Sequence, residues 1–246
     1  MAKPLADRVA LITGASRGIG YATAVALAKE GAHVVATART PGGLEELGDA
    51  VRAVGGTATL VPLQMRDTDG IARLAQALNE RYKKLDILIG NAALVGSNSP
   101  LDHFTPQEWD EVIAVNLTAN WHLIRHMDAL LRKSDAGRAV FLTSGAAANP
   151  SAYRGLYATS KAGLEALARV YADETKSTAV RVNIFNPGPT RTKMRAAVMP
   201  GEDPMTLPTP DVVAATIVPL CLPTFTETGK LYDFRAGKLM SFHPPA

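Results

Sequence analysis

The chain alternates between short apolar runs and longer segments with helical spacing, and this alternation restricts the fold more than any other feature. Runs rich in β-branched residues occupy residues 8–13, 33–38, 57–63, 85–89, 138–144, 180–185 and 230–234. Between them, apolar residues recur every three or four positions over 19–30, 68–82, 106–132 and 157–175. Because the runs are apolar throughout, we expect a parallel sheet buried on both faces. With right-handed crossovers, the pattern predicts an α/β fold, a three-layer, doubly wound Rossmann fold with a seven-stranded parallel sheet.

Length, cysteine usage and charge restrict the class of protein. The 246 residues contain no repeat and no linker, which predicts one domain over residues 1–246. Cys221 is the single cysteine, and the first eight residues lack an apolar signal core, so we expect a cytoplasmic protein. No apolar run is long enough for a membrane span, and the net charge of +3 is too small and scattered for a nucleic-acid surface.

A glycine-rich turn follows the first apolar run and precedes the first helical segment. Residues 13–20 read Thr-Gly-Ala-Ser-Arg-Gly-Ile-Gly. Gly14 can adopt unusual backbone angles, Gly18 lets the main chain approach a diphosphate, and Gly20 lets the helix pack on the strand. Free amides at a helix start favour an anion. The turn therefore predicts a dinucleotide site, with a tight turn that binds nothing as the alternative.

The end of the second apolar run indicates which dinucleotide is bound. NAD sites usually carry a carboxylate there, which accepts hydrogen bonds from the ribose 2′-hydroxyl, whereas this chain has Ala38 followed by Arg39. Arg39 and Arg17 of the glycine turn offer guanidinium donors suited to a 2′-phosphate. NADP(H) is therefore predicted in preference to NAD(H), unless both arginines are only solvated surface charges.

Tyr157 and Lys161 form a candidate catalytic pair. Their separation of four residues places both side chains on one helical face, one turn apart. A nearby ammonium favours the ionised phenol, which brings the pKa of a tyrosine closer to the range useful for proton transfer. The same spacing also occurs by chance, with the tyrosine packed and the lysine solvated, so the pair depends on its context.

That context consists of several motifs in a fixed order along the chain. They are the glycine turn, Asn91-Ala92-Ala93, Asn116, Ser144 thirteen residues before Tyr157, Lys161, and Pro187-Gly188 with Thr192. In this combination, essentially the whole chain resembles the single-domain short-chain dehydrogenases and reductases. The stretch 186–210 is similar to a bacterial YciK-like branch of that family, which implies no settled substrate.

The resemblance implies a role for each of four residues. Tyr157 is expected to be the general acid in reduction, protonating a carbonyl oxygen while hydride leaves the nicotinamide. Ser144 is expected to hydrogen-bond that oxygen, with a serine that caps its own turn as the alternative. Lys161 is expected to lower the tyrosine pKa and to bind the nicotinamide ribose. Asn116 is expected to hold a water that links the lysine to solvent; asparagine is a poor helix-interior residue, which also indicates a hydrogen-bonding task, although an exposed polar residue is the alternative.

The resemblance also extends the cofactor site beyond the glycine turn. It implies contacts to the nicotinamide carboxamide from the main chain near Thr190 and the hydroxyl of Thr192. Gly90 and Gln64 depart from the family pattern, which often has an asparagine and an aspartate there; a glutamine carbonyl can accept the same bond from adenine. The full predicted cofactor set is Gly14, Ser16, Arg17, Gly18, Ile19, Gly20, Arg39, Gln64, Met65, Asn91, Ala92, Tyr157, Lys161, Pro187, Gly188, Thr190 and Thr192.

A proline-rich segment at about 189–210 is expected to be a partly ordered loop that covers the substrate. Apolar side chains such as Met194 would exclude water there. Arg191, Lys193 and Arg195 form a basic cluster in this loop. We hypothesise that the cluster steers an anionic substrate or clamps the cofactor diphosphate, unless the three residues are solvated surface charges.

His122 and His126 are spaced four apart, but no metal site is predicted, because no glutamate follows His122 and a third ligand is not evident. A helix surface or a subunit contact fits the pair better. The family resemblance implies that the helices carrying Asn116 and Tyr157 form the dimer face. A homodimer or homotetramer is therefore expected.

Together these motifs predict an NADP(H)-dependent oxidoreductase that interconverts a carbonyl compound and a secondary alcohol by hydride transfer with tyrosine acid–base catalysis. The expected partner is a small-molecule substrate, with no nucleic acid and no membrane. Two alternatives stay open: a 3-oxoacyl-carrier-protein-type reductase and a non-catalytic dinucleotide-sensing protein. An epimerase or dehydratase usually needs a larger substrate domain.

Overall fold

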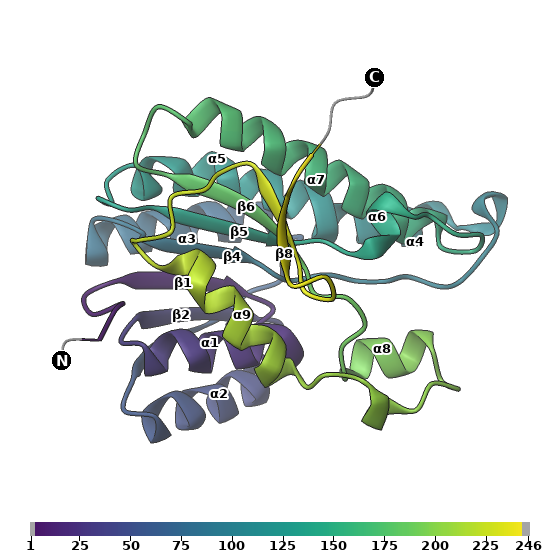
Figure 1. Cartoon of the computed structure of the whole chain (residues 1–246), viewed down its shortest axis with the longest axis horizontal. Helices are drawn as coiled ribbons and strands as arrows, with labels where there is room; N and C mark the ends of the chain where they lie inside the picture. The colour runs from purple at the N-terminus through teal and green to yellow at the C-terminus, as the bar shows by residue number, and fades with distance from the viewer. Residues whose placement is uncertain (1–2, 243–246) are drawn as a thin grey trace.

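One sheet of eight strands runs through the molecule in the order β3-β2-β1-β4-β5-β6-β7-β8 (Figure 1). The structure is a computed structural model that describes residues 3–242. Neighbouring strands are parallel except β7 and β8, which pair antiparallel. The strands are β1 (Val9–Thr13), β2 (His33–Ala38), β3 (Thr57–Pro62), β4 (Ile87–Gly90), β5 (Arg138–Leu142), β6 (Arg181–Asn186), β7 (Lys230–Asp233) and β8 (Lys238–Ser241).

Helices cover both faces of this sheet (Figure 1). One layer contains α1 (Gly18–Lys29), α2 (Pro41–Ala53) and α9 (Pro210–Cys221). The other contains α3 (Thr68–Tyr82), α4 (Pro106–Ile113), a π-helical turn η2 (Ala114–Thr118), α5 (Ala119–Leu131) and α7 (Gly155–Thr175). The connections hold four short helical segments: η1 (Leu101–His103), α6 (Gly145–Ala148), α8 (Lys193–Val198) and η3 (Pro204–Thr206).

Two hydrophobic cores lie on opposite faces of the sheet. Every residue of β1, β4 and β5 is buried, as the apolar runs predict. Phe141 packs into the core under α3, α5 and α7, and Phe185 packs into the core under α1, α2 and α9. The α/β, three-layer, doubly wound architecture is therefore confirmed. Because the order reverses beside β1, the loops after β1, β4, β5 and β6 meet at one edge, where such folds bind ligands.

The sheet has one strand more than the predicted seven and is not fully parallel. β8 returns against β7 after a tight turn in which Gly237 has a φ of +61° and the Asp233 carboxylate accepts a hydrogen bond from the Ala236 main-chain N–H at 2.8 Å. β8 is exposed along its length, so no apolar run marks it in the sequence. β3, at the other edge, is also only partly buried, because an edge strand has one neighbour instead of two.

The predicted helix at 106–132 is divided rather than continuous. Its α-helical hydrogen bonds end at Ile113, a π-helical turn follows, and α5 resumes at Ala119. Asn116 lies in the turn and is fully buried, so it is not an exposed surface residue. Turns of this kind often occur at functional sites, because they redirect a side chain within a helix.

The predicted loop at about 189–210 contains more order than its prolines indicate. It holds α8 and η3, and Pro210 occupies the first position of α9. Proline is compatible with that position, because the first helical N–H needs no partner within the helix. Pro41 and Pro106 begin α2 and α4 in the same way.

None of the helices within residues 3–242 is both long and apolar enough to cross a bilayer. The predicted domain, 1–246, includes residues 1–2 and 243–246, which lie outside the described residues.

Candidate active site

The glycine turn is braced by Asn91 at the end of β4. Its side-chain amide donates to the main-chain oxygens of Thr13 and Gly14 at 2.8 and 3.2 Å. The hydroxyl of Thr13 in turn accepts hydrogen bonds from the main-chain N–H groups of Asn91 and Ala92, both at 3.0 Å. Gly14 has a φ of +66°, in the left-handed region that favours glycine. Asn91 therefore fixes the shape of the turn through its side chain.

The start of α1 is open to an anionic group. No side chain among the described residues caps this helix, and its first turn has no acidic residue. A Cβ atom placed on Gly18 would lie 3.4 Å from Cγ2 of Thr192, so the turn and the loop after β6 face each other closely. Bare glycine and free amides at a helix start form the donor set that fits the diphosphate of a dinucleotide.

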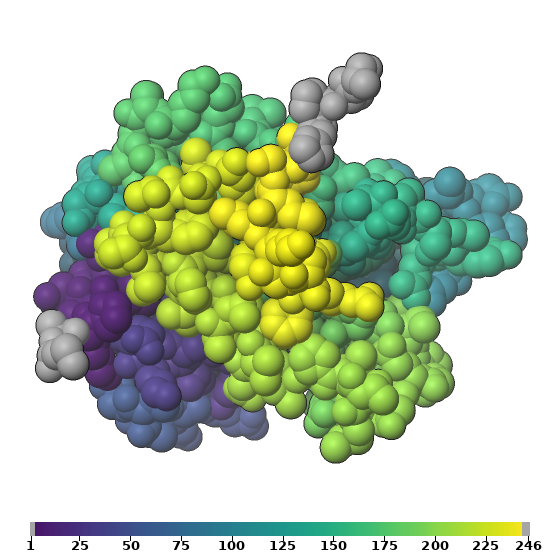
Figure 2. All heavy atoms as spheres, in the orientation of Figure 1, coloured from purple at the N-terminus to yellow at the C-terminus, as the bar shows by residue number. Residues whose placement is uncertain are grey.

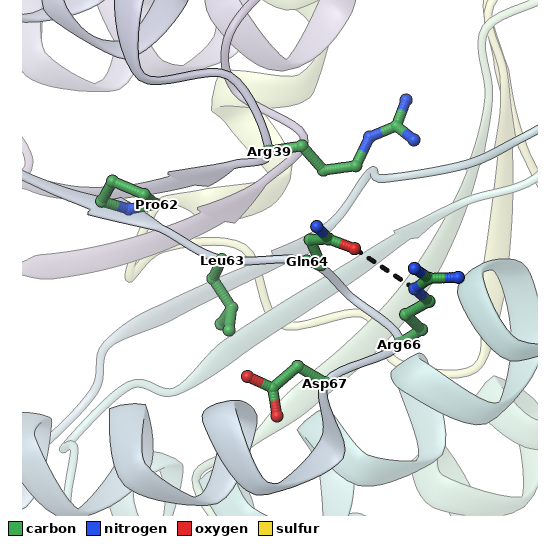
Figure 3. A pocket seen from close by; sticks show the side chains of 6 residues that line it. All are labelled: Arg39, Pro62, Leu63, Gln64, Arg66 and Asp67. Atoms are coloured by element: carbon green, nitrogen blue, oxygen red, sulfur yellow. Dashed lines mark hydrogen bonds between the residues drawn. The ribbon is translucent and has the colours of Figure 1, made fainter.

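A hollow of about 520 Å³ lies beside this turn, at the ends of β2 and β3 (Figure 3). Arg39 reaches it from the end of β2, and Arg66 reaches it from the segment after β3, where its Nε donates to the Gln64 side-chain oxygen at 3.2 Å. Neither arginine has a carboxylate partner within residues 3–242. The Asp67 carboxylate at the rim is engaged, because it caps α3 and pairs with Arg73 at 3.1 Å. The hollow is therefore positively charged.

Ser144, Tyr157 and Lys161 come together where β5 ends and α7 begins. The hydroxyl of Ser144 accepts a hydrogen bond from the Ala146 main-chain N–H at 3.3 Å, which leaves its own proton free to donate. The buried Lys161 ammonium donates to the main-chain oxygen of Leu142 at 2.7 Å and lies 5.9 Å from the centre of the Tyr157 ring. Because Leu142 is two residues before Ser144, this contact holds the start of α7 against the end of β5.

Asn116 connects this helix to the loop after β4. Its side chain accepts from the Leu94 main-chain N–H at 2.8 Å and donates to the Leu94 oxygen at 2.8 Å and to the Ser160 hydroxyl at 2.9 Å. Ser160 donates onward to the main-chain oxygen of Tyr157 at 2.8 Å. The main-chain oxygen of Asn116 accepts a hydrogen bond from the Asn120 side chain at 2.8 Å.

The loop after β6 is anchored to the end of β7. Asn186 accepts from the Gly188 main-chain N–H at 3.2 Å and donates to the Asp233 carboxylate at 2.9 Å. The Thr192 hydroxyl caps α8, because it accepts the N–H three residues later at 3.1 Å. Figure 2 shows the yellow segment that contains β7 and β8 against this light-green loop on the visible face.

Two members of the basic cluster in this loop hold the loop itself together. Arg191 donates to the main-chain oxygens of Pro204 and Leu207 at 2.8 and 3.2 Å. Arg195 forms a two-point ion pair with Glu202, with distances of 2.6 and 2.7 Å. In this arrangement the two guanidinium groups are occupied within the loop, which differs from the hypothesis that they meet a substrate or diphosphate.

The remaining predicted residues lie along the same edge of the sheet. Gly90 has no room for the asparagine found in many family members, because a Cβ atom there would lie 2.5 Å from both Asn120 Oδ1 and Phe141 Cδ1. The other predicted cofactor residues, in the loops or helix starts that follow strands, are Ser16, Ile19, Met65, Pro187 and Thr190.

His122 and His126 on α5 stack with ring centres 5.9 Å apart, and no group of metal-ligating side chains occurs among the described residues.

Comparison with known proteins decides the family. The family described as short chain dehydrogenase matches residues 8–203. The chain is a short chain dehydrogenase. It is 36% identical to YciK of Escherichia coli (strain K12), named an uncharacterized oxidoreductase, over 95% of this chain and 94% of that protein.

Two further relatives bear on the cofactor of this short chain dehydrogenase. A short chain dehydrogenase from Shigella flexneri 2a, crystallised in complex with NADP, matches with a TM-score of 0.90 and 34% identity over 95% of this chain and 99% of its own. A Mycobacterium tuberculosis protein named as an NAD-dependent oxidoreductase is 34% identical over 74% of this chain and 71% of its own.

Burial is the largest cause of the pKa shifts of Tyr157 and Lys161 in this short chain dehydrogenase. Burial raises the pKa of Tyr157, while the Ser144 side chain and the charge of Arg154 act in the opposite direction. Burial lowers the pKa of Lys161 to about 8, and the Glu165 carboxylate one turn further along α7 opposes that change. The Lys161 ammonium is directed at the Leu142 oxygen and is not among the groups that shift the Tyr157 pKa here, so the expectation that it lowers that pKa stays a prediction.

Sequence reasoning missed three residues that shape the site: Arg66, Ser160 and Arg154. Arg66 carries a signal in the sequence, because it directly follows the predicted Gln64 and Met65. Ser160 has no such signal, since its importance comes from its contact with Asn116. Arg154, three residues before Tyr157, is apparent only from the structure, in which its guanidinium lies beside the loop after β6.

Proposed function

We propose that this short chain dehydrogenase interconverts a carbonyl compound and a secondary alcohol with NADP(H), and that Tyr157 is its general acid and base. The observation that carries the proposal is the convergence of Ser144, Tyr157 and Lys161 at the end of β5, at the same edge of the sheet as the glycine turn. We place the activity in one domain over residues 1–246, with the loop at about 189–210 covering a small-molecule substrate.

Bound NADPH would supply a hydride, which carries two electrons, to the carbonyl carbon. Tyr157 would donate its phenolic proton to the carbonyl oxygen, so that the π bond of the carbonyl is replaced by one C–H and one O–H bond, and the phenolate would then regain a proton from solvent. Ser144 donates a hydrogen bond to the same oxygen and fixes its position. Oxidation follows the reverse path, with Tyr157 as the base.

Lys161 and Asn116 would support this step. The ammonium of Lys161 has three donors and uses one on Leu142, so two remain for the nicotinamide ribose. The side chain of Asn116 is occupied by Leu94 and Ser160, so a bound water would have to approach its main-chain oxygen instead.

Preference for NADP(H) over NAD(H) is part of the proposal. Arg39 and Arg66 border the hollow at the ends of β2 and β3, and Arg17 directly precedes α1 in the glycine turn. Three guanidinium groups suit a 2′-phosphate, and no carboxylate stands at the end of β2 to accept from a 2′-hydroxyl. The NADP complex of the Shigella relative supports this choice.

We also propose that two copies pair through α5 and α7. Trp121 on α5 is 42% exposed and Val170 on α7 is 57% exposed, so both helices offer a large apolar side chain that a second copy could bury. Light scattering would give twice or four times the mass of 26.0 kDa. A single-chain mass at micromolar concentration would contradict the pairing.

The decisive experiment follows NADPH absorbance with a panel of ketones, aldehydes, quinones and acyl thioesters. We expect turnover of at least one carbonyl class, and we expect Tyr157→Phe to retain NADPH binding, measured by fluorescence, while losing turnover. A Tyr157→Phe variant with the wild-type rate would overturn the assignment. Turnover restricted to acyl thioesters would favour a reductase of carrier-bound chains, and NADPH binding without any turnover would favour a sensor.

A further inference from the structure

A second hollow, of about 670 Å³, lies at the outer side of the candidate active site. It is formed by the loop after β4 and by the segment that leads into α7. The two segments are joined by a hydrogen bond from the Ser99 main-chain N–H to the Tyr153 oxygen at 2.9 Å. The residues that line the hollow are Asn98, Ser151, Ala152, Tyr153 and Arg154.

Arg154 is the one basic side chain in this lining, and the lining contains no carboxylate. The main-chain N–H of Arg154 donates to the Ser151 oxygen at 3.2 Å, which fixes the backbone just before α7. Tyr153, directly before it, has a φ of +68°, a left-handed conformation that a non-glycine residue adopts only when its surroundings demand it. The backbone therefore turns sharply at this point and presents Arg154 at the hollow.

The guanidinium of Arg154 lies near the hollow, the loop after β6 and Tyr157. It extends from the hollow to the covering loop, where one nitrogen lies 3.0 Å from the sulfur of Met199. It is also close enough to Tyr157, three residues later, for its charge to lower the pKa of the phenol. A substrate held between the loop and Tyr157 would therefore meet this cation.

The cation has no charged partner within residues 3–242. No carboxylate oxygen lies within 4.0 Å of Arg154, and the Met199 sulfur is only a weak acceptor. By contrast, Arg195 in the same loop is paired with Glu202, and Arg191 is occupied by main-chain oxygens. Within residues 3–242 the Met199 sulfur is the one side-chain acceptor in contact with this half-buried guanidinium, which therefore suits a carboxylate that approaches with two oxygens.

We propose that Arg154 binds a carboxylate of the substrate, so that the substrates are oxo acids and the products are the corresponding hydroxy acids. This inference rests on the proposed function. The carboxylate takes no part in the bond changes, and the carbonyl of the same molecule receives the hydride and the proton as described above. Arg154 would thus determine substrate class without being required for the hydride transfer itself.

The test compares each oxo acid with its uncharged amide. The probes are 4-oxopentanoate and phenylglyoxylate with their carboxamides, assayed with NADPH on wild type, Arg154→Gln and Arg154→Lys. Wild type should prefer an acid over its amide, and Arg154→Gln should reduce that preference about 10- to 100-fold, the range for one charge-assisted hydrogen bond. The reduced preference should appear mainly as a higher KM for the acid, and Arg154→Lys should restore part of the preference.

The ratio of acid to amide separates recognition from any effect of Arg154 on Tyr157, because a changed tyrosine pKa affects both substrates equally. Arg52→Gln, which removes an exposed arginine on α2, is the matched control and should leave the ratio unchanged. Three results would overturn this inference and leave the proposed function standing. They are an equal loss of acid and amide turnover in Arg154→Gln, an unchanged acid-to-amide ratio in that variant, and a wild type that reduces neutral ketones in preference to both acids. Absence of turnover with every carbonyl compound would instead overturn the proposed function.

Discussion

The Lys161 ammonium lies 2.7 Å from the main-chain oxygen of Leu142, in a position where only 2% of the residue is exposed. A charge held at this depth is compensated by one main-chain dipole and by the half-buried Glu165 carboxylate one turn away. The lysine is therefore charged at neutral pH but binds its proton less tightly than in water. This property makes the pH dependence of both stability and activity informative.

We expect the wild-type protein to gain stability relative to Lys161→Met as pH rises from 8 to 10.5. The pKa of Lys161 is lowered from 10.5 to about 8, so the unfolded chain binds more protons than the folded one in this window. The gain should approach about 3 kcal/mol, because each pKa unit corresponds to about 1.4 kcal/mol. Urea unfolding at several pH values measures it.

Lys176→Met provides the control for that measurement, since Lys176 is exposed at the end of the same helix. Its stability difference from wild type should stay constant over the same pH range. A Lys161→Met difference that also stays constant would show that the ammonium is solvated in the folded protein.

We expect Glu165→Gln to move the alkaline limb of the kcat/KM profile to lower pH. The Glu165 carboxylate raises the pKa of Lys161 and so opposes the effect of burial. Without this charge the pKa of Lys161 falls further, and the lysine loses its proton at a lower pH. The amide keeps a hydrogen-bond acceptor for the Thr143 hydroxyl, which lies 2.6 Å from the carboxylate. Glu174→Gln, at an exposed position on α7, should leave the limb in place. A limb unmoved in both variants would exclude Lys161 as its source.

We expect Arg39→Asp to reverse the cofactor preference. The substitution removes a donor from the hollow at the ends of β2 and β3 and adds an acceptor for a ribose 2′-hydroxyl. The KM for NADPH should rise about 10- to 100-fold, the range for one charge-assisted hydrogen bond, while NADH becomes usable. Arg52→Gln is the matched control, because Arg52 is an exposed arginine on α2 that does not line the hollow. An unchanged ratio of the two KM values in Arg39→Asp would refute the role of this arginine.

The parts of this protein that the sequence predicts are those set by local spacing. The order of strands and helices follows from apolar periodicity, and Tyr157 and Lys161 share a helical face because they are four residues apart. The glycine turn is equally local, since Gly14 and Gly18 have the positive φ values that only glycine adopts freely. Such features depend on a few neighbouring residues and carry their signal in the chain.

The parts that the sequence does not predict depend on contacts between distant segments. Nothing near Asn116 in the sequence indicates that its side chain would be occupied by Leu94 and Ser160, 22 and 44 residues away. The exposed strand β8 has no apolar pattern, and it forms only because β7 offers an edge. The direction of the Lys161 ammonium is likewise set by β5, nineteen residues earlier.

We expect Glu202→Gln to loosen the covering loop and to raise the KM for the carbonyl substrate a few fold with little change in kcat. Glu202 holds Arg195 by two hydrogen bonds of 2.6 and 2.7 Å, and the pair closes α8 onto the segment that follows it. Faster proteolysis between residues 193 and 207 would report the loosening directly. Glu45→Gln, an exposed change on α2, should alter neither readout.

The wild-type protein should reproduce the effect of Glu202→Gln in acid. Hydrogen bonding to Arg195 lowers the pKa of Glu202 from 4.5, so the pair is intact above that pH and is lost as pH falls through the lowered value. Proteolysis of the wild-type loop by an acid-active protease should therefore accelerate below pH 4.5, toward the rate of the variant, while the variant's own rate stays flat. A wild-type loop that is still cut more slowly than the variant well below pH 4.5 would show that the ion pair does not hold the loop closed.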